Sequence, residues 1–260
     1  MTRRSFLPAA VSGAVGAANA ATTPAQRAIL DLRYFYLRNS ADNQRRRVTQ
    51  FLESGVLPAM KRAGAGPVGV FSSNIAPDGP FLLLLHSHAS FAAMEQTSDK
   101  VAADADYQKA LEAFNSQPGL NYERQQRVLL RAFPSIPQIE VPQGEAKRAA
   151  RIFELRTYES PNSSTLRRKI GMFDDGEIAV FRKVGMTPVF FGETLVGPKM
   201  PNLTYMLAYD DLAHREKTWR AFVSDPDWAK LREKPGLSDA EVVSNISNIF
   251  LSPLGFSQIR

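Results

Sequence analysis

A short sequence pattern occurs twice in the chain, about 120 residues apart. Residues 29–33 read ILDLR and residues 152–156 read IFELR, so each run places two apolar residues before an acid, a leucine and an arginine. At an offset of 121, residues 51–110 align without a gap onto residues 172–231. The positions that agree are mainly turn formers, helix caps and core residues, such as Gly55 with Gly176, Pro80 with Pro201 and Asp104 with Asp225. The chain is therefore predicted to contain two copies of one structural unit.

The hydrophobic pattern of the first copy predicts the order strand, helix, strand, strand, helix, strand, which is that of the ferredoxin-like fold. Pro58 is expected to kink or break the first helix. Ser90 and Asp104 are expected to cap the helical segments that follow the hairpin. The predicted boundaries are an export signal at 1–20, a linker at 21–28, a first repeat at 29–133, a linker at 134–150 and a second repeat at 151–260.

A ferredoxin-like sheet carries its helices on one face only, so its other face needs a cover. The strand Phe81–Leu85 is apolar on both alternations, whereas a sheet with one face in water should alternate apolar and polar residues. Two copies in one chain can cover each other. We therefore predict an α+β fold in which two tandem ferredoxin-like (βαββαβ) repeats pack sheet to sheet as a pseudo-dimeric barrel, with helices outside. Two separate domains are the alternative, and exposed sheet edges leave a homodimer open.

The first twenty residues resemble a bacterial twin-arginine export signal. Arg3 and Arg4 precede Phe6 and Leu7, a run of small residues follows, and residues 18–20 form an A-x-A cleavage pattern. The alternative is a disordered basic tail. Cleavage after Ala20 predicts a periplasmic or secreted protein.

Composition excludes several classes of function. The chain has no cysteine, which removes disulfides, thiolate nucleophiles and cysteine-ligated metals. Its net charge of +6 falls to +4 without the two signal arginines, and the basic residues are dispersed, so we expect no nucleic-acid partner. No run is long and apolar enough for a transmembrane segment. Neither a nucleophile elbow nor a glycine-rich phosphate loop is present.

The second copy resembles the NIPSNAP family. The residues that carry the resemblance are Phe153–Tyr158, Asn202, Leu207, Tyr209, Asp211, Leu212, Arg215, Trp219, Ala221, Phe222, Asp225, Pro226 and Trp228. The resemblance departs at Met206–Ala208, where many members are expected to carry a histidine and a tryptophan. It implies a dimeric α+β barrel, in agreement with the strand pattern, but no assigned activity.

Charged residues on the two equivalent first strands are the first candidates for a ligand site. Because side chains alternate along a strand, Glu154, Arg156 and Tyr158 share one face, as do Asp31 and Arg33 in the first copy. If that face looks into the barrel, an arginine can grip a carboxylate while the phenol donates a hydrogen bond. The alternative is that each acid pairs with its arginine and has only a structural role.

The second candidates are His86 and His88, which share a face at the end of a very apolar strand. Two imidazoles can bind a metal or relay a proton. A third ligand is not evident, and the equivalent positions of the second copy are Leu207 and Tyr209, so we predict no metal site and interpret the pair as polar caps of the strand. Tyr209 is kept with the candidate ligand residues.

The sequence thus predicts an exported NIPSNAP-type barrel protein that binds a small molecule or a protein partner and leaves catalysis open. The alternative is a cofactor-independent or haem-handling barrel enzyme, monooxygenase or isomerase-like, that acts on a small oxygenated or anionic substrate. No cofactor is identified. An open pocket lined by these polar residues favours binding or catalysis, whereas an interior filled by Leu, Phe and Met favours a structural role.

Overall fold

The structure is a computed structural model that describes residues 26–39, 41–143 and 150–260. The predicted export signal lies outside these residues, as does part of each predicted linker. The first repeat contains β1 (Ile29–Tyr36), α1 (Gln44–Phe51), the π-helical turn η1 (Leu52–Val56), α2 (Leu57–Arg62), β2 (Gly69–Ile75), β3 (Phe81–His88), α3 (Phe91–Ala102), α4 (Ala105–Asn115) and β4 (Arg124–Ala132).

The second repeat follows the same order. It contains β5 (Ile152–Glu159), α5 (Ser163–Met172), η2 (Phe173–Glu177), α6 (Ile178–Lys183), β6 (Thr187–Val196), β7 (Asn202–Tyr209), α7 (Leu212–Val223), α8 (Pro226–Arg232), α9 (Asp239–Val242) and β8 (Asn245–Pro253). The predicted caps form, because the side chains of Ser90, Asp104 and Asp225 accept hydrogen bonds from backbone N–H groups of the following turn.

All eight strands belong to one closed antiparallel barrel in the order β1-β3-β2-β8-β5-β7-β6-β4. Each repeat supplies four adjacent strands. The two sheets meet edge to edge, where β2 pairs with β8 and β4 pairs with β6. The predicted α+β barrel is confirmed, and its eight described strands leave no sheet edge for a second chain. Exposed sheet edges therefore no longer support the homodimer that the sequence left open.

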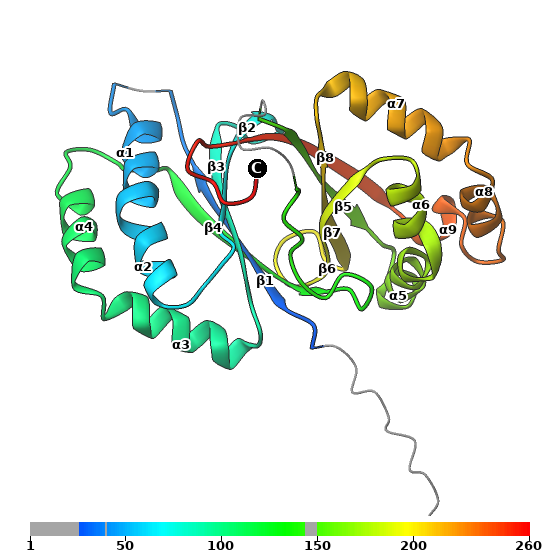
Figure 1. Ribbon diagram of the computed structural model, residues 1–260, viewed down its shortest axis with the longest axis horizontal. Coiled ribbons are helices and arrows are strands. Elements are labelled where there is room, and N and C mark those ends of the chain that lie inside the picture. Colours follow the sequence, from blue (N-terminus) through cyan, green and yellow to red (C-terminus); the bar gives the residue numbers. More distant parts are fainter. Residues whose placement is uncertain (1–25, 40, 144–149) are drawn as a thin grey trace, which may run out of the picture.

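The helices form two outer layers, one over each repeat (Figure 1). Helices α1 to α4 cover β1 to β4 at one end of the molecule, and α5 to α9 cover β5 to β8 at the other. Two apolar clusters fill these layers, one around Val48, Phe51 and Leu82 and one around Phe173, Phe181 and Tyr205. A third cluster, which draws on both repeats, occupies the barrel interior.

The first helix of the first repeat is continuous through a π-helical turn. The sequence predicted that Pro58 would kink or break this helix. The helix is not broken, because Pro58 lies in the first turn of α2, directly after η1. A turn occurs at the same place in the second repeat, η2, where Ala179 takes the place of the proline, but there the chain leaves the helical conformation at Gly176 and the helix is kinked. Gly55 permits the close packing here, because a Cβ atom would lie 2.8 Å from the Cβ of Ala110 on α4.

The barrel interior is apolar. Its walls are formed by inward side chains such as Leu30, Leu32, Phe153 and Leu155, together with Phe71 and Met206 from β2 and β7. A hollow of about 180 Å³ remains at one mouth of the barrel, lined in part by Tyr34, Tyr36 and Thr204. The condition on which the sequence-based ligand site rested, that Asp31, Arg33, Glu154, Arg156 and Tyr158 look into the barrel, is not met. Strand alternation places them on the outer face, beneath the helices.

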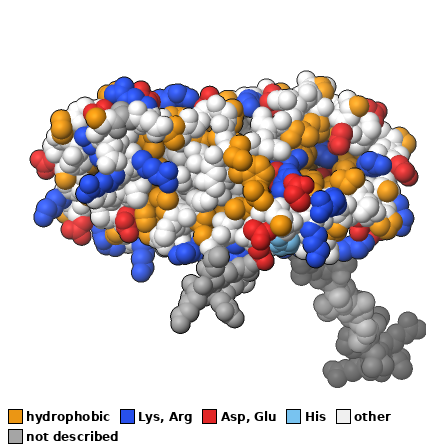
Figure 2. All heavy atoms as spheres, turned by 90° about the horizontal axis from the view of Figure 1, so that it is seen from above, with side chains coloured by type: hydrophobic (Ala, Val, Ile, Leu, Met, Phe, Trp, Pro, Cys, Tyr) orange, Lys and Arg blue, Asp and Glu red, His pale blue; other side chains and the backbone are white. Residues whose placement is uncertain are grey.

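Among the described residues, no helix combines the length and apolarity that crossing a bilayer requires. On the face shown in Figure 2, basic and acidic side chains are interspersed with apolar ones.

Candidate functional site

The outer face of the first-repeat sheet carries a buried polar cluster. Asp31 lies on β1 directly opposite His86 on β3, and His88 lies two pairs further along, opposite Ile29. On the other side of β1, β4 places Arg127 opposite Arg33. Asp31, His86 and His88 are 0%, 1% and 6% exposed. The sequence singled out four of these five residues; it missed Arg127, because β4 reaches the cluster only through sheet pairing.

Asp31 is the centre of the cluster. Arg127 donates from Nε to Oδ1 at 2.9 Å and from Nη2 to Oδ2 at 2.6 Å, and Arg33 Nη2 lies 3.2 Å from Oδ2. The Nε2 atoms of His86 and His88 lie 3.2 and 3.8 Å from the same oxygen. Burial opposes ionisation of Asp31, but the histidines and the two arginines outweigh it and hold its pKa well below the usual range.

Both imidazoles are buried, and each has at least one ring nitrogen without a hydrogen-bond partner among the described residues. Nδ1 and Nε2 of His86, Nε2 of His88 and Nε of Arg33 have no hydrogen-bond partner among the described residues, since the contacts to Asp31 lack hydrogen-bond geometry. Burial lowers the pKa of His86 despite the neighbouring carboxylate. A buried polar atom without a partner costs about 1–3 kcal/mol. Because buried polar atoms normally have a hydrogen-bond partner, this set of nitrogens marks a candidate binding site.

A cavity of about 370 Å³ lies between this cluster and the first-repeat helices. Arg33, His86 and His88 line its polar end, and the other walls are mainly apolar side chains from β1, β3, α1 to α4 and η1. Helix α3 buries none of its twelve residues and so leaves space beneath it. A second pocket of about 360 Å³, beside Gly64–Gly66, shares His88 and Thr97 with the first.

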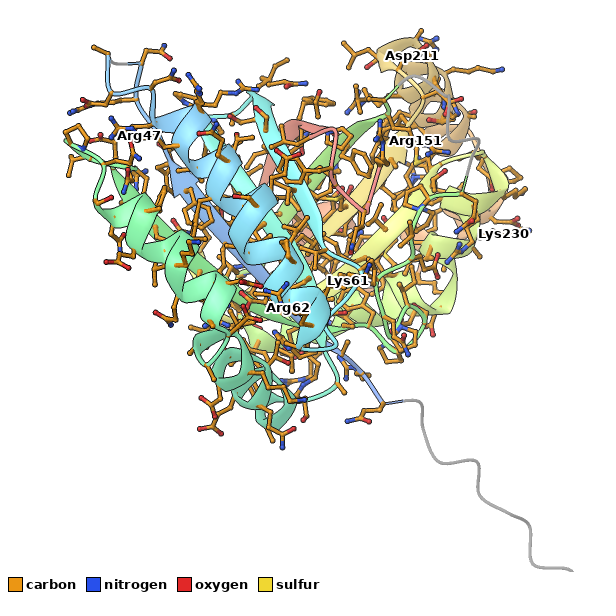
Figure 3. The ribbon with its side chains drawn as sticks, turned by 60° about the vertical axis from the view of Figure 1, so that its left-hand side comes forward. Arg47, Lys61, Arg62, Arg151, Asp211 and Lys230 are labelled. Carbon is orange, nitrogen blue, oxygen red and sulfur yellow. The ribbon has the colours of Figure 1, made fainter. Side chains whose placement is uncertain are left out.

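An ion pair ties one end of the helical layer together. Arg62 is the last residue of α2 and is labelled in Figure 3. It donates to both carboxylate oxygens of Asp104 at 2.6 and 2.7 Å. Asp104 is also the N-cap of α4. The pair therefore fixes the end of α2 against the start of α4, on the border of the cavity's helical wall.

In the second repeat, aromatic side chains fill the corresponding space. Phe181, Tyr205, Trp219 and Phe222 form one cluster with ring centroids 4.7 to 6.1 Å apart along their contacts. At the offset of 121 their counterparts are four smaller residues that all line the first-repeat cavity: Met60, Leu84, Ser98 and Val101. The cavity thus exists because the first copy has smaller side chains at equivalent positions.

Most polar groups of the second-repeat cluster pair with one another, although Nε of Arg156 has no hydrogen-bond partner among the described residues. Glu154 accepts from Arg156 at 2.7 Å, from Arg215 at 2.9 and 3.1 Å and from the indole of Trp219 at 3.2 Å. Burial opposes ionisation, but both arginines hold the pKa of Glu154 low. The Arg156 guanidinium also stacks 4.4 Å over Trp219. In the second repeat, Glu154 and Arg156 therefore pair with each other, as the alternative of a structural role predicted.

Two tyrosines of the predicted site complete this second-repeat network. Tyr158 accepts a hydrogen bond from Arg156 and from Tyr205, at 3.1 and 2.9 Å. Tyr209 is fully buried, and its hydroxyl has no hydrogen-bond partner among the described residues. Burial raises the pKa of Tyr209. The eight predicted residues therefore form two separate clusters, one under each helical layer.

Comparison with known proteins agrees with this architecture. Residues 153–258 match the NIPSNAP family model. The second repeat is a NIPSNAP family domain. A comparison with functionally curated proteins finds no match. The cavity therefore lies in the repeat that precedes the NIPSNAP domain.

Solved structures resemble the NIPSNAP domain and the first repeat together. One is a Lactobacillus acidophilus protein named "putative monooxygenase". The alignment covers 87% of this chain and 94% of that protein, with a TM-score of 0.57 and 11% identity. A Fusobacterium nucleatum protein of the same name covers 88% and 94%, with a TM-score of 0.57 and 10% identity. An "anthrone oxidase-like protein" covers 89% and 93%, with a TM-score of 0.50 and 9% identity. At these identities the likeness shows the fold alone.

Proposed function

We propose that the protein binds a small molecule in the cavity of its first repeat. The observation that carries the proposal is the pairing of a partly open cavity of about 370 Å³, lined by both apolar and polar side chains, with buried, unpaired imidazole and guanidine nitrogens at one end. The volume lies at the lower end of the ~300–1,000 Å³ typical of small-molecule sites. A ligand with an apolar ring system and an oxygen-bearing or anionic group fits both parts.

Each end of the cavity favours one part of such a ligand. Phe35, Leu84 and Phe114 offer apolar surface, which favours rings over sugars or polar chains. At the other end, the guanidinium of Arg33 and the imidazoles favour a carboxylate or hydroxyl oxygen. Asp31 disfavours a second anion nearby, but its charge is matched by Arg127 and Arg33.

The second repeat supplies the variant that tests this proposal. Ser98→Trp places the residue of position 219 at its equivalent in the first copy and should fill the cavity without changing its polar end. Titration calorimetry with 2-naphthoate and 2-naphthol should show binding to the native protein and a loss of at least about tenfold in the variant. Ser116→Trp, on an exposed position outside the cavity lining, is the matched control. Native mass spectrometry reports molecules that copurify. If neither probe nor any copurifying molecule distinguishes the native protein from Ser98→Trp, the proposal fails.

A second candidate function is an enzyme that acts on such a ligand. The observation in its favour is that two imidazole rings, 4.6 Å apart, line the polar end of the first-repeat cavity. One structural relative is named anthrone oxidase-like, so anthrone is a rational probe. Anthrone and dioxygen would give anthraquinone and water. Oxygen uptake no faster than with His86→Leu would exclude this activity on anthrone.

Export is a further part of the proposal and rests on the sequence of residues 1–20 alone. Replacement of Arg3 and Arg4 by lysine should retain the protein in the cytoplasm, because twin-arginine signals need the arginine pair. Fractionation of cells that express either form measures this. Unchanged export of the lysine variant would refute it.

A further inference from the structure

Three potential metal ligands converge at the polar end of the cavity. The Nε2 atoms of His86 and His88 lie 3.2 and 3.8 Å from Asp31 Oδ2, and donor atoms of the three residues lie within 4.8 Å of one another. Bonds of about 2.0–2.2 Å place neighbouring nitrogen and oxygen ligands of one ion about 3.0–3.5 Å apart. The three donors therefore already stand close to the separations found around a single ion.

The fold itself does not require these histidines. Their equivalents in the second repeat are Leu207 and Tyr209, which occupy the same places on β7, beneath the helical layer of that repeat. In the first repeat, both ring nitrogens of His86 and Nε2 of His88 are buried without partners. These buried nitrogens could therefore bind a ligand. The second repeat has the same fold without histidines at these positions.

Two arginines also contact Asp31 and must be accommodated. Arg127 engages both carboxylate oxygens, whereas Arg33 makes a single, longer contact to Oδ2. Their side chains are 38% and 30% exposed, so either can turn towards solvent or into the cavity. Arg127 can remain on Oδ1 and orient the carboxylate, the usual role of an outer partner at a metal site. An ion on Oδ2 would displace the Nη2 contacts of both Arg33 and Arg127 to that oxygen, and this frees the Arg33 guanidinium for a cavity ligand.

We propose that Asp31, His86 and His88 bind one divalent transition-metal ion at the polar end of the cavity. Two imidazoles and one carboxylate suit Fe²⁺, Mn²⁺, Co²⁺ or Zn²⁺, whereas Mg²⁺ and Ca²⁺ prefer oxygen ligands. Three protein ligands leave coordination positions open, and these face the cavity. From the sequence no third ligand was evident; the pairing of β1 with β3 supplies Asp31. The inference goes beyond ligand binding and does not depend on it.

Metal titration of the full-length protein tests the assignment. After dialysis against a chelator, Co²⁺ should bind with one ion per chain, give visible d–d absorption and be displaced by Zn²⁺. His86→Leu and His88→Tyr introduce the residues of the second repeat, which the fold accepts there. Each should weaken Zn²⁺ binding by at least about 100-fold in calorimetry and abolish the rise in Tm that Zn²⁺ gives the native protein.

Controls separate this site from other sources of metal binding. His214→Ala removes the third histidine of the chain, on α7, and should leave Zn²⁺ affinity unchanged. Asp31→Asn serves as a third ligand variant if a histidine variant fails to fold. Ser98→Trp should lose the naphthyl probes but keep the metal, because His88 also borders the second pocket. No stoichiometric binding by the native protein, or binding that survives His86→Leu and His88→Tyr, would overturn the assignment.

Discussion

A buried ion pair in the second repeat allows a direct comparison between the two copies. Lys169 on α5 and Glu177 in η2 are 1% and 2% exposed, and Nζ lies 3.0 Å from Oε2. The ammonium group also lies 4.9 Å from the ring of Phe173 and 5.3 Å from that of Trp228. At the same offset of 121 the first repeat has Val48 and Val56. The fold therefore accepts either a charged or an apolar pair at this place.

We expect each single replacement of this pair to be costly and the double replacement to be nearly neutral. Lys169→Met or Glu177→Leu leaves a buried charge without its main partner, which costs about 3–5 kcal/mol. The double variant restores an apolar contact of similar volume, which is often neutral or stabilising by about 1–4 kcal/mol. The coupling energy between the two sites should therefore be several kcal/mol.

The pH dependence of the Lys169→Met variant provides a second measure. Burial raises the pKa of Glu177 above its ordinary value of 4.5, and Lys169 opposes this rise. Without the lysine the folded protein holds the Glu177 proton to higher pH, whereas the unfolded chain releases it near 4.5. The folded state then binds more protons, so its stability falls as pH rises through the folded pKa. The variant should be less destabilised at pH 5 than at pH 8.

Urea unfolding followed by circular dichroism at both pH values measures these quantities. The native protein, the two single variants and the double variant form a thermodynamic cycle. If the loss of unfolding free energy in the double variant equals the sum of the losses in the two single variants, the two charges are not coupled and this reasoning is refuted.

Three further predictions concern the packing of the helices. Gly55→Ala should lower the free energy of unfolding by about 1–3 kcal/mol, because its Cβ would lie 2.8 Å from that of Ala110; Ala110→Gly should restore part of the loss. Gly171→Ala, where no atom lies within 4 Å of the new Cβ, should instead stabilise α5 by about 0.4–1 kcal/mol in the same assay. Helix α3, which buries none of its residues, should exchange its amide hydrogens faster than α7. Equal exchange in α3 and α7 would contradict the loose packing assigned to α3.

The sequence predicted the fold because repetition and strand pattern act locally. The paired runs at residues 29–33 and 152–156, together with the double apolar alternation of β3, were enough for two ferredoxin-like units that bury their sheets against each other. Closure into a single eight-stranded barrel depends on the edges β2, β4, β6 and β8, whose pairing across the repeats has no local signature. The sequence left the direction of the Asp31 face open for a related reason. Alternation groups residues by face but does not say which face the helices cover.

The candidate site was predictable only in parts. Asp31, Arg33, His86 and His88 were all identified, but as two unrelated groups, because the contact between them is made by the pairing of β1 with β3. Arg127 enters from the far side of β1. The cavity is harder still to predict, since it arises from four side chains that are smaller than their partners in the second repeat. Aligning the copies position by position could have found it.

The asymmetry between the copies bears on where function lies. A duplicated fold needs each helical layer to be packed well enough to hold the barrel, and the second repeat meets this need with an aromatic cluster and a fully paired Glu154. The first repeat keeps the same backbone but replaces those aromatic residues with smaller ones and introduces two histidines without partners. Both changes reduce stability, one by leaving a cavity and the other by burying unsatisfied nitrogens. Two independent losses at a single place are hard to explain by packing, and a ligand that occupies the space and satisfies the nitrogens would account for both.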